Sequence, residues 1–187
     1  MEELSFINVK HDRKCKKEVK KLYQEAFPKE EKMPFWLLCL LDKENTTQFY
    51  GIYDKEQFVG LVYNVYYQDI VFIFYLAINP KLRGQGYGSR VLKALQEKYL
   101  QYRMVLNIEQ VDEKSSNYQQ RLKRRKFYEN NGFSGLNYTI TEMGVVYEMM
   151  GYDKQNKPVT KEEYMALMEN YFGKFLFQYG YRKICEI

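Results

Sequence analysis

The sequence predicts a mixed α/β domain, with a central mixed, mostly antiparallel sheet and helices on both of its faces. Three strand-like runs at 48–53, 58–66 and 70–78 follow one another with connections of three or four residues, which favours an antiparallel meander. The third run is apolar at successive positions, as in a strand that is buried on both sides. Beyond it, strand-like and helical segments alternate, which indicates crossover connections.

The segments before the meander are expected to form one strand and two helices. Residues 4–9 are predicted to be the first strand. Asp12 can cap a helix that Pro28 stops, and Pro34 suits the first turn of a short second helix. The apolar residues of the first helix recur at helical spacing: Cys15, Val19, Leu22 and Ala26.

The meander is expected to lead into a turn, a helix and a further strand. Asn79-Pro80 ends the third strand, because proline cannot donate to the ladder. A glycine-rich turn follows, and Arg103–Glu109 is predicted to be a strand. Between them lies an amphipathic helix with one apolar face, formed by Val91, Leu92, Leu95 and Tyr99.

A strongly charged helix is predicted at 117–130, ended by a left-handed cap at Gly132. Two strands, 133–141 and 145–150, then flank a turn at Gly144. After Asp153 the composition turns polar, and Thr160 and Glu163 have the spacing of a capping box that opens a last helix. We therefore expect a main domain at 1–153 and a C-terminal helical appendage at 154–187 that packs on it.

The composition restricts the class of protein to which this chain can belong. The 187 residues are 45% hydrophobic and 28% charged, as in a globular chain that can bury a core. The longest apolar runs, 35–41 and 70–78, are too short to cross a membrane, and the acidic N-terminus lacks the apolar core of a secretory signal. We expect a cytoplasmic protein without a membrane partner.

Cysteine and histidine usage excludes further chemistry. Cys15, Cys39 and Cys185 are odd in number and widely spaced, which argues for reduced thiols and against a disulfide framework or a zinc site. We therefore predict no metal. His11 is the single histidine and lies in a polar run, so mechanisms that depend on histidine are disfavoured.

The glycine-rich turn 83–89 lies between a buried strand and an amphipathic helix. Glycines let the backbone approach a ligand closely, and free N–H groups at a helix N-terminus attract anions. Arg83 adds a positive charge that suits phosphate. The turn is neither a Walker loop nor the dinucleotide fingerprint, because its glycine spacing is different and no Gly-Lys-Ser/Thr occurs. An ordinary tight turn is the structural alternative.

Two stretches resemble motifs of one family. Arg83-x-x-Gly86-x-Gly88, after the strand 74–80, resembles the acetyl-coenzyme A motif of the GNAT superfamily of N-acetyltransferases. Residues 125–133 resemble the R-x-x-Tyr-x-x-x-Gly-Phe helix end of that family. The resemblance covers roughly residues 4–150. Residues 26–35 are similar to small bacterial members, but Lys32 replaces part of their usual Glu-Arg-x-Pro.

The resemblance implies a GNAT-like fold and acetyl-coenzyme A as cosubstrate. The amides of 85–89 would hold the pyrophosphate, and Arg83 and Arg90 would meet phosphate charge. Pantetheine would pair with the backbone of 76–78, where the strand splays from its neighbour. The implied cofactor-binding residues are Leu76, Ala77, Ile78, Arg83, Gly84, Gln85, Gly86, Tyr87, Gly88, Ser89 and Asn117.

The resemblance also implies catalytic residues. Tyr128 falls where many members place a tyrosine that protonates the leaving thiolate, and a phenol is protonated at neutral pH. The alternative is that Tyr128 is an aromatic residue of the core with no catalytic role. Glu109 falls where relatives often carry an acidic residue, so it is the candidate general base, against a solvent-facing strand residue as the alternative. Glu30 and Glu31 border the acceptor side and are candidates for binding a cationic amine.

The expected function is transfer of acetyl from acetyl-coenzyme A to a primary amine by direct attack, in a monomer or homodimer. The acceptor is a small-molecule or peptide amine. Two alternatives remain: a non-catalytic acyl-coenzyme A sensor, and a module that binds nucleic acid or an acidic partner through the basic run 121–126. Because one element alone carries a basic cluster, we predict no nucleic-acid partner.

Overall fold

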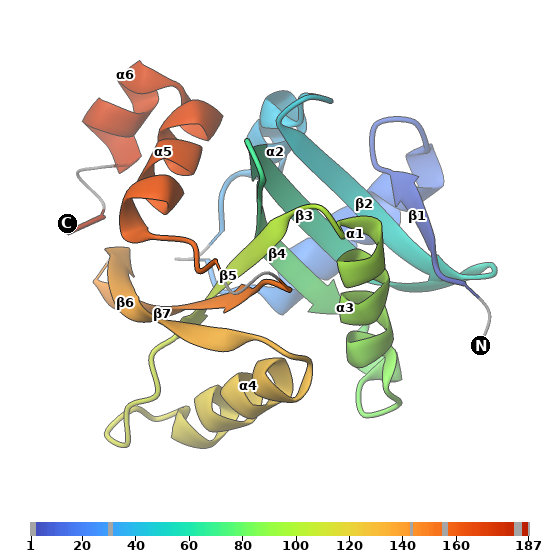
Figure 1. The fold of residues 1–187 in the computed structure, drawn as a ribbon. Helices are drawn as coiled ribbons and strands as arrows, with labels where there is room; N and C mark the ends of the chain where they lie inside the picture. The colour runs from blue at the N-terminus through green and yellow to red at the C-terminus, as the bar shows by residue number, and fades with distance from the viewer. Residues whose placement is uncertain (1–2, 30–31, 143, 155–156, 182–184, 187) are drawn as a thin grey trace. The chain divides into compact units, whose positions relative to one another are not determined.

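The computed structural model describes residues 3–29, 32–142, 144–154, 157–181 and 185–186 (Figure 1). The chain divides into two compact units, which are described separately. The first unit comprises residues 1–66 and 73–100, and the second comprises residues 67–72 and 101–187. Strand β4 therefore begins in the second unit and ends in the first.

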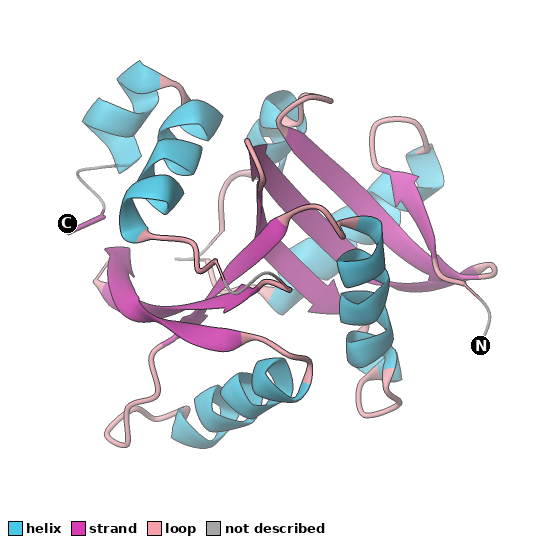
Figure 2. Cartoon of the chain, viewed as in Figure 1, coloured by secondary structure: helices cyan, strands magenta, loops and turns pink. Residues whose placement is uncertain are grey.

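The mixed α/β class predicted from the sequence is confirmed (Figure 2). Hydrogen bonds join the described strands in the order β1-β2-β3-β4-β5-β7-β6-β8, and β4 pairs with β5 in parallel. The elements are β1 (Ser5–Asn8), α1 (Arg13–Ala26), α2 (Phe35–Leu41), β2 (Thr47–Asp54), β3 (Gln57–Tyr67), β4 (Ile70–Ile78), η1 (Pro80–Leu82), α3 (Tyr87–Lys98), β5 (Arg103–Glu109), α4 (Tyr118–Asn130), β6 (Ser134–Glu142), β7 (Val145–Tyr152), α5 (Lys161–Phe172), α6 (Lys174–Leu176), η2 (Phe177–Tyr181) and β8 (Cys185–Glu186).

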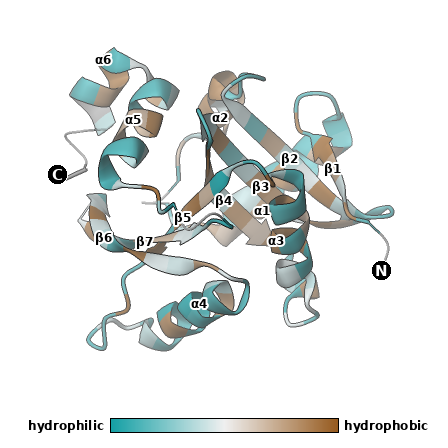
Figure 3. Cartoon of the chain, in the orientation of Figure 1, coloured by the Kyte–Doolittle hydropathy of each residue, from teal (hydrophilic) through white to brown (hydrophobic). Residues whose placement is uncertain are grey.

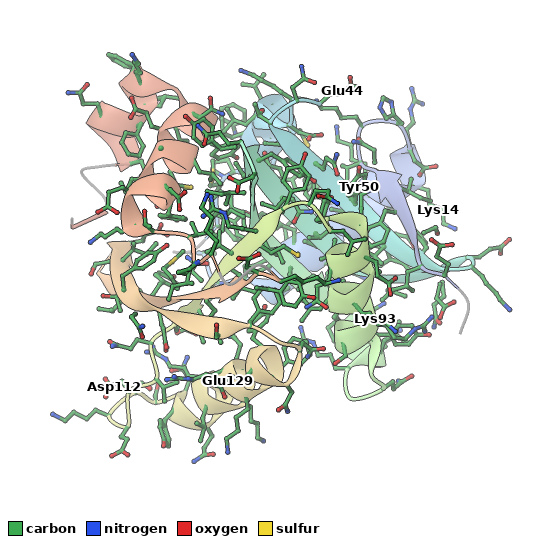
Figure 4. The ribbon with its side chains drawn as sticks, viewed as in Figure 1. Lys14, Glu44, Tyr50, Lys93, Asp112 and Glu129 are labelled. Carbon is green, nitrogen blue, oxygen red and sulfur yellow. The ribbon has the colours of Figure 1, made fainter. Side chains whose placement is uncertain are left out.

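In the first unit, helices cover both faces of β2. Successive residues of a strand point to opposite faces, so two neighbouring residues of β2 contact two different helices. On one face α1 lies so close that a Cβ at Gly51 would be 2.5 Å from Cys15 Sγ. On the other face the end of α3 packs, with the Lys98 ammonium 5.4 Å from the centre of the Tyr50 ring (Figure 4). The two helices are drawn behind and in front of the strands in Figure 1.

Local signals in the first unit act largely as predicted. Asp12 caps α1, and its Oδ1 accepts a hydrogen bond from Cys15 N at 2.6 Å. One detail differs, since Pro34 precedes α2 as its N-cap residue instead of lying in its first turn. The carbonyl of Pro34 accepts hydrogen bonds from Leu37 N and Leu38 N, so this residue still opens the helix.

In the second unit, α4 and α5 lie on opposite sides of β6 and β7 (Figure 1). The capping box of α5 is confirmed: Thr160 N donates to Glu163 Oε2 at 2.9 Å, and Glu163 N donates to Thr160 Oγ1 at 3.2 Å. After α5 come α6, η2 and β8, which the sequence did not predict, because such short elements show no periodicity. The division into 1–153 and 154–187 stays a prediction.

A buried arginine ties α5 to the sheet of the second unit. Arg103, at the start of β5, is only 4% exposed. It donates two hydrogen bonds to the carboxylate of Asp69, at 2.9 and 2.8 Å, and two to that of Glu163, both at 2.8 Å. These hydrogen bonds lower the pKa of both carboxyl groups, because they favour the charged form.

We expect Arg103→Met to lower the free energy of unfolding at pH 7 by about 2 kcal/mol, because the four charge-assisted bonds are lost while both carboxylates keep partial contact with water. For a chain of this size the melting temperature should fall by about 5 °C. The stabilisation is present above the unfolded-state pKa values, near ~4, and is lost as the pH falls below them. Thermal melts between pH 7 and 3 should therefore show the difference between parent and variant shrinking in acid. A constant difference would contradict this account.

Candidate functional site

The glycine-rich turn of the first unit connects β4 to α3 through η1. Asn79 opens η1, and its Oδ1 accepts a hydrogen bond from Lys81 N at 3.2 Å. Gly84 and Gly86 have φ values of 76° and 82°, which side chains other than that of glycine rarely allow. A Cβ placed at either position would meet no atom within 4 Å, so the space above this backbone is open.

The turn presents a row of backbone N–H groups without acceptors. In the described part of the chain, none of the amides of residues 84–89 donates a hydrogen bond, and the first amide of α3 that does so is that of Arg90, to Gly86 O at 3.1 Å. Consecutive free amides at a helix N-terminus, with the helix dipole behind them, form an anion-binding concavity.

The two arginines of the turn differ in their partners. Arg83 is exposed, and its Nε donates to Ile78 O at 3.2 Å, while its terminal nitrogens have no partner among the described residues. The Arg90 Nη1 donates to Asp54 Oδ2 at 2.7 Å and lowers the pKa of that carboxyl. Tyr87 also donates to Asp54, at 3.1 Å. Asp54 thus anchors the start of α3, a role that no local pattern in the sequence indicated.

The last part of β4 carries the backbone predicted to pair with pantetheine. The parallel ladder with β5 pairs Ile70–Phe72 with Arg103–Val105, and β4 continues for six further residues beyond it. On its β3 side, Ala77 lies against Gly60, where a Cβ would come within 2.3 Å of the Ala77 carbonyl oxygen. Leu76 and Ile78 are half-buried. The assignment of 76–78 to the cofactor stays a prediction.

In the second unit, Glu109 lies at the end of β5 and is only 8% exposed, so it is not the solvent-facing residue considered as an alternative. Its Oε1 accepts a hydrogen bond from Asn117 Nδ2 at 3.2 Å and forms an ion pair with Arg121 Nη2 at 3.0 Å. Its Oε2 accepts a hydrogen bond from Arg124 Nη1 at 2.8 Å. We call Glu109 with Asn117, Arg121 and Arg124 the Glu109 clamp.

The clamp also engages Asn117, which the sequence assigned to the cofactor. Its Oδ1 accepts a hydrogen bond from Arg121 Nε at 2.7 Å, while its Nδ2 donates to Glu109. Both polar ends of the amide are therefore used within the second unit. The two arginines were missed as partners of Glu109, because residues 12 and 15 positions apart in the sequence carry no pairing signal.

Tyr128 lies near the end of α4, half-buried between two aromatic rings. Phe127 and Phe133 make edge-on contacts with it, with ring centres 5.1 and 5.8 Å away. Burial raises the pKa of Tyr128 to about 12, although the charge of Arg124 acts in the opposite direction. Its hydroxyl makes no hydrogen bond to any described residue. The phenol is therefore protonated and open to an outside partner.

Glu30 and Glu31, the candidates for binding the acceptor amine, lie outside the described residues. In the part of the chain that the structure covers, no helix is long and apolar enough to cross a membrane.

Comparisons with known proteins agree with this geometry. Residues 45–135 match the family model of the GNAT acetyltransferase domain. A protein assigned to the GNAT family of acetyltransferases, from Bacteroides thetaiotaomicron, has a similar fold, with a TM-score of 0.72 and 21% identity over 94% of this chain and 98% of that one. No curated protein sequence matches the chain significantly.

Two further solved structures are similar at lower identity. The ribosomal-protein-S18-alanine N-acetyltransferase of Escherichia coli has a TM-score of 0.60 and 15% identity over 80% of this chain and 92% of that one. An aminoglycoside 6'-N-acetyltransferase complexed with coenzyme A has a TM-score of 0.61 and 13% identity over 79% of this chain and 94% of that one. The chain carries a GNAT acetyltransferase domain. Its fold is similar to that of the GNAT-family acetyltransferase from Bacteroides thetaiotaomicron.

Proposed function

We propose that the chain transfers the acetyl group of acetyl-coenzyme A to a primary amine by direct attack. The observation that carries this proposal is the row of unpartnered amides at 84–89, with the open guanidinium of Arg83 beside it. Amides and guanidinium together suit a diphosphate, which is the most strongly charged part of coenzyme A. The edge of β4 at 76–78 is proposed to pair with the pantetheine amides.

The proposed reaction has three parts. A primary amine must first be neutral, since its ordinary pKa is near ~10.4. Its nitrogen then forms a bond to the thioester carbonyl carbon, and the C–S bond breaks with its electron pair going to sulfur. We propose that Tyr128 gives the leaving sulfur its proton, because the phenol is protonated and its hydroxyl has no partner among the described residues. The amine nitrogen loses one proton to water as the amide forms, and a proton from water restores the phenol, so the reaction is balanced.

The acceptor is proposed to be a small-molecule or peptide amine. The names of two proteins with similar folds include one acceptor of each kind. One is named for the alanine of a ribosomal protein and the other for an aminoglycoside. Because fold is shared while acceptor chemistry differs, the fold by itself selects neither class.

The test is release of free thiol from acetyl-coenzyme A in the presence of an amine panel that includes polyamines, aminoglycosides and peptides with free N-termini. Mass spectrometry of the acceptor should show one added acetyl group. Binding of acetyl-coenzyme A without turnover on any amine would favour the non-catalytic sensor. Absence of binding would refute the proposal.

The basic run 121–126 is proposed not to bind nucleic acid. Arg121 and Arg124 are paired with Glu109, and Arg125 is paired with Glu148 at 3.3 Å and with Glu129 at 3.0 Å on the helix surface (Figure 4). Most of the positive charge of this run is thus matched by carboxylates of the same unit, which leaves little for phosphates. We expect DNA to bind more weakly than about 1 μM at physiological salt. Tighter binding that Arg124→Ala with Arg125→Ala removes would contradict this.

A further inference from the structure

We propose that Glu109 is a positioning residue, which holds α4 against the sheet of the second unit and thereby sets the place of Tyr128. The expected effect of Glu109 on catalysis rests on the proposed role of Tyr128. The attachment of α4 by Glu109 depends only on contacts within the second unit. It differs from the general-base role that the sequence suggested for Glu109.

The first argument is that α4 lacks the usual attachment of a helix. None of its residues is buried, and most of them are hydrophilic (Figure 3). A surface helix ordinarily packs through an apolar stripe, which supplies most of its stability. Here the apolar contribution is limited to half-buried side chains such as those of Phe127 and Tyr128. Other interactions must therefore determine where the helix lies.

The second argument is the geometry of the clamp. Asn117 and Arg124 each donate a hydrogen bond to one oxygen of the Glu109 carboxylate, and Arg121 adds an ion pair at 3.0 Å. The Glu109 side chain is only 10% exposed. Arg121 also donates from Nη1 to the Gln110 carbonyl at 2.9 Å, which fixes it to the end of β5 a second time. Charge-assisted hydrogen bonds to a shielded carboxylate are among the stronger polar interactions in proteins. They fix both distance and orientation.

The third argument is that the clamped face of α4 is the face that carries Tyr128. Arg121, Arg124 and Tyr128 are spaced three and four residues apart, so they form one stripe along the helix. One helical turn separates Arg124 from Tyr128, and its positive charge acts to lower the pKa of the phenol. Glu109 offsets that charge. Loss of Glu109 would both release the helix and leave an unmatched cation beside the phenol.

The same geometry disfavours proton transfer to Glu109. A general base needs a free lone pair within reach of the proton that it accepts. In Glu109 each oxygen already accepts one hydrogen bond, and the lone pairs that remain are shielded, because the side chain is only 10% exposed and lies against two arginines. The two roles predict different effects of replacing the arginines. If Glu109 positions α4, loss of an arginine should lower activity, whereas if Glu109 is a general base, it should not.

The experiment compares Glu109→Gln and Arg124→Gln with the matched control Lys123→Gln. Lys123 is an exposed cation of the same helix without an ion pair among the described residues. Hydrogen exchange of the α4 amides should accelerate by about tenfold or more in the first two variants and remain unchanged in the control. With an acceptor in hand, kcat should fall by about 10–100-fold in the first two, with the KM for acetyl-coenzyme A nearly unchanged.

A double-mutant cycle with Tyr128→Phe separates this role from the others. If Glu109 acts through Tyr128, Glu109→Gln should cost less than about twofold in kcat once Tyr128 is phenylalanine. Full turnover in Arg124→Gln together with an inactive Glu109→Gln would overturn the proposal in favour of a base. Unchanged exchange in α4 would overturn it as well. If Glu109→Gln fails to fold, Arg124→Gln tests the proposal in its place. The Arg124 side chain is 43% exposed, so we expect this variant to fold.

Failure of the proposed function has a different signature. Normal turnover in Tyr128→Phe alone would remove the acid role, while the exchange rates of α4 would still report on the clamp.

Discussion

Replacement of Tyr128 with phenylalanine should lower kcat by about 10²–10⁴, the usual size of general acid catalysis. The variant keeps the ring and therefore its contacts with Phe127 and Phe133, and it removes only the hydroxyl. The hydroxyl has no protein partner among the described residues, so its removal leaves no buried group unpaired. The KM for acetyl-coenzyme A should change little, because an interaction made mainly in the transition state does not affect ground-state binding.

Steady-state kinetics and a thermal melt of the same variant decide between acid and core aromatic. A core role predicts a lower melting temperature with near-normal turnover of the folded protein. Phe127→Leu is the matched control, since it alters the neighbouring ring and leaves the phenol in place. Turnover of Tyr128→Phe within about twofold of the parent would end the acid assignment.

Substitution of Gly86 by valine should weaken acetyl-coenzyme A binding by about 100-fold or more. A Cβ at Gly86 meets no protein atom within 4 Å, so the side chain would occupy the space in which we place the pyrophosphate. Loss of two charge-assisted hydrogen bonds, at about 1.5–3 kcal/mol each, accounts for a change of this size. Calorimetric titration with acetyl-coenzyme A measures it directly.

The control for backbone strain is Gly144→Val. Gly144 has a φ of 77°, close to the 82° of Gly86, and a Cβ there also meets no atom within 4 Å. Both variants should therefore lose a similar amount of stability, about 1–3 kcal/mol, from the same unfavourable backbone conformation. Only Gly86→Val should lose binding. Equal affinities of the two variants would refute the assignment of the turn.

Much of the fold could be predicted because its signals are local. Asp12 caps α1 through an amide three residues away, and the capping box of Thr160 and Glu163 spans the same distance. The limits of β5, Arg103–Glu109, agree with the sequence because an apolar run bounded by polar segments marks them. The glycine-rich turn is local too, since the positive φ at Gly84 and Gly86 depends on these residues themselves.

The partners of the charged side chains were decided only by the tertiary structure. The sequence marked Arg90 for phosphate, yet the fold pairs it with Asp54, 36 residues earlier. It marked Glu109 as a base, yet the packing of α4 brings two arginines onto its carboxylate. Arg103 joins Asp69 and Glu163, which are 34 and 60 residues away. Periodicity and capping act between residues a few positions apart, so the local sequence shows them. An ion pair between distant residues forms only where the packing of whole elements brings the two charges together, and the local sequence does not show this.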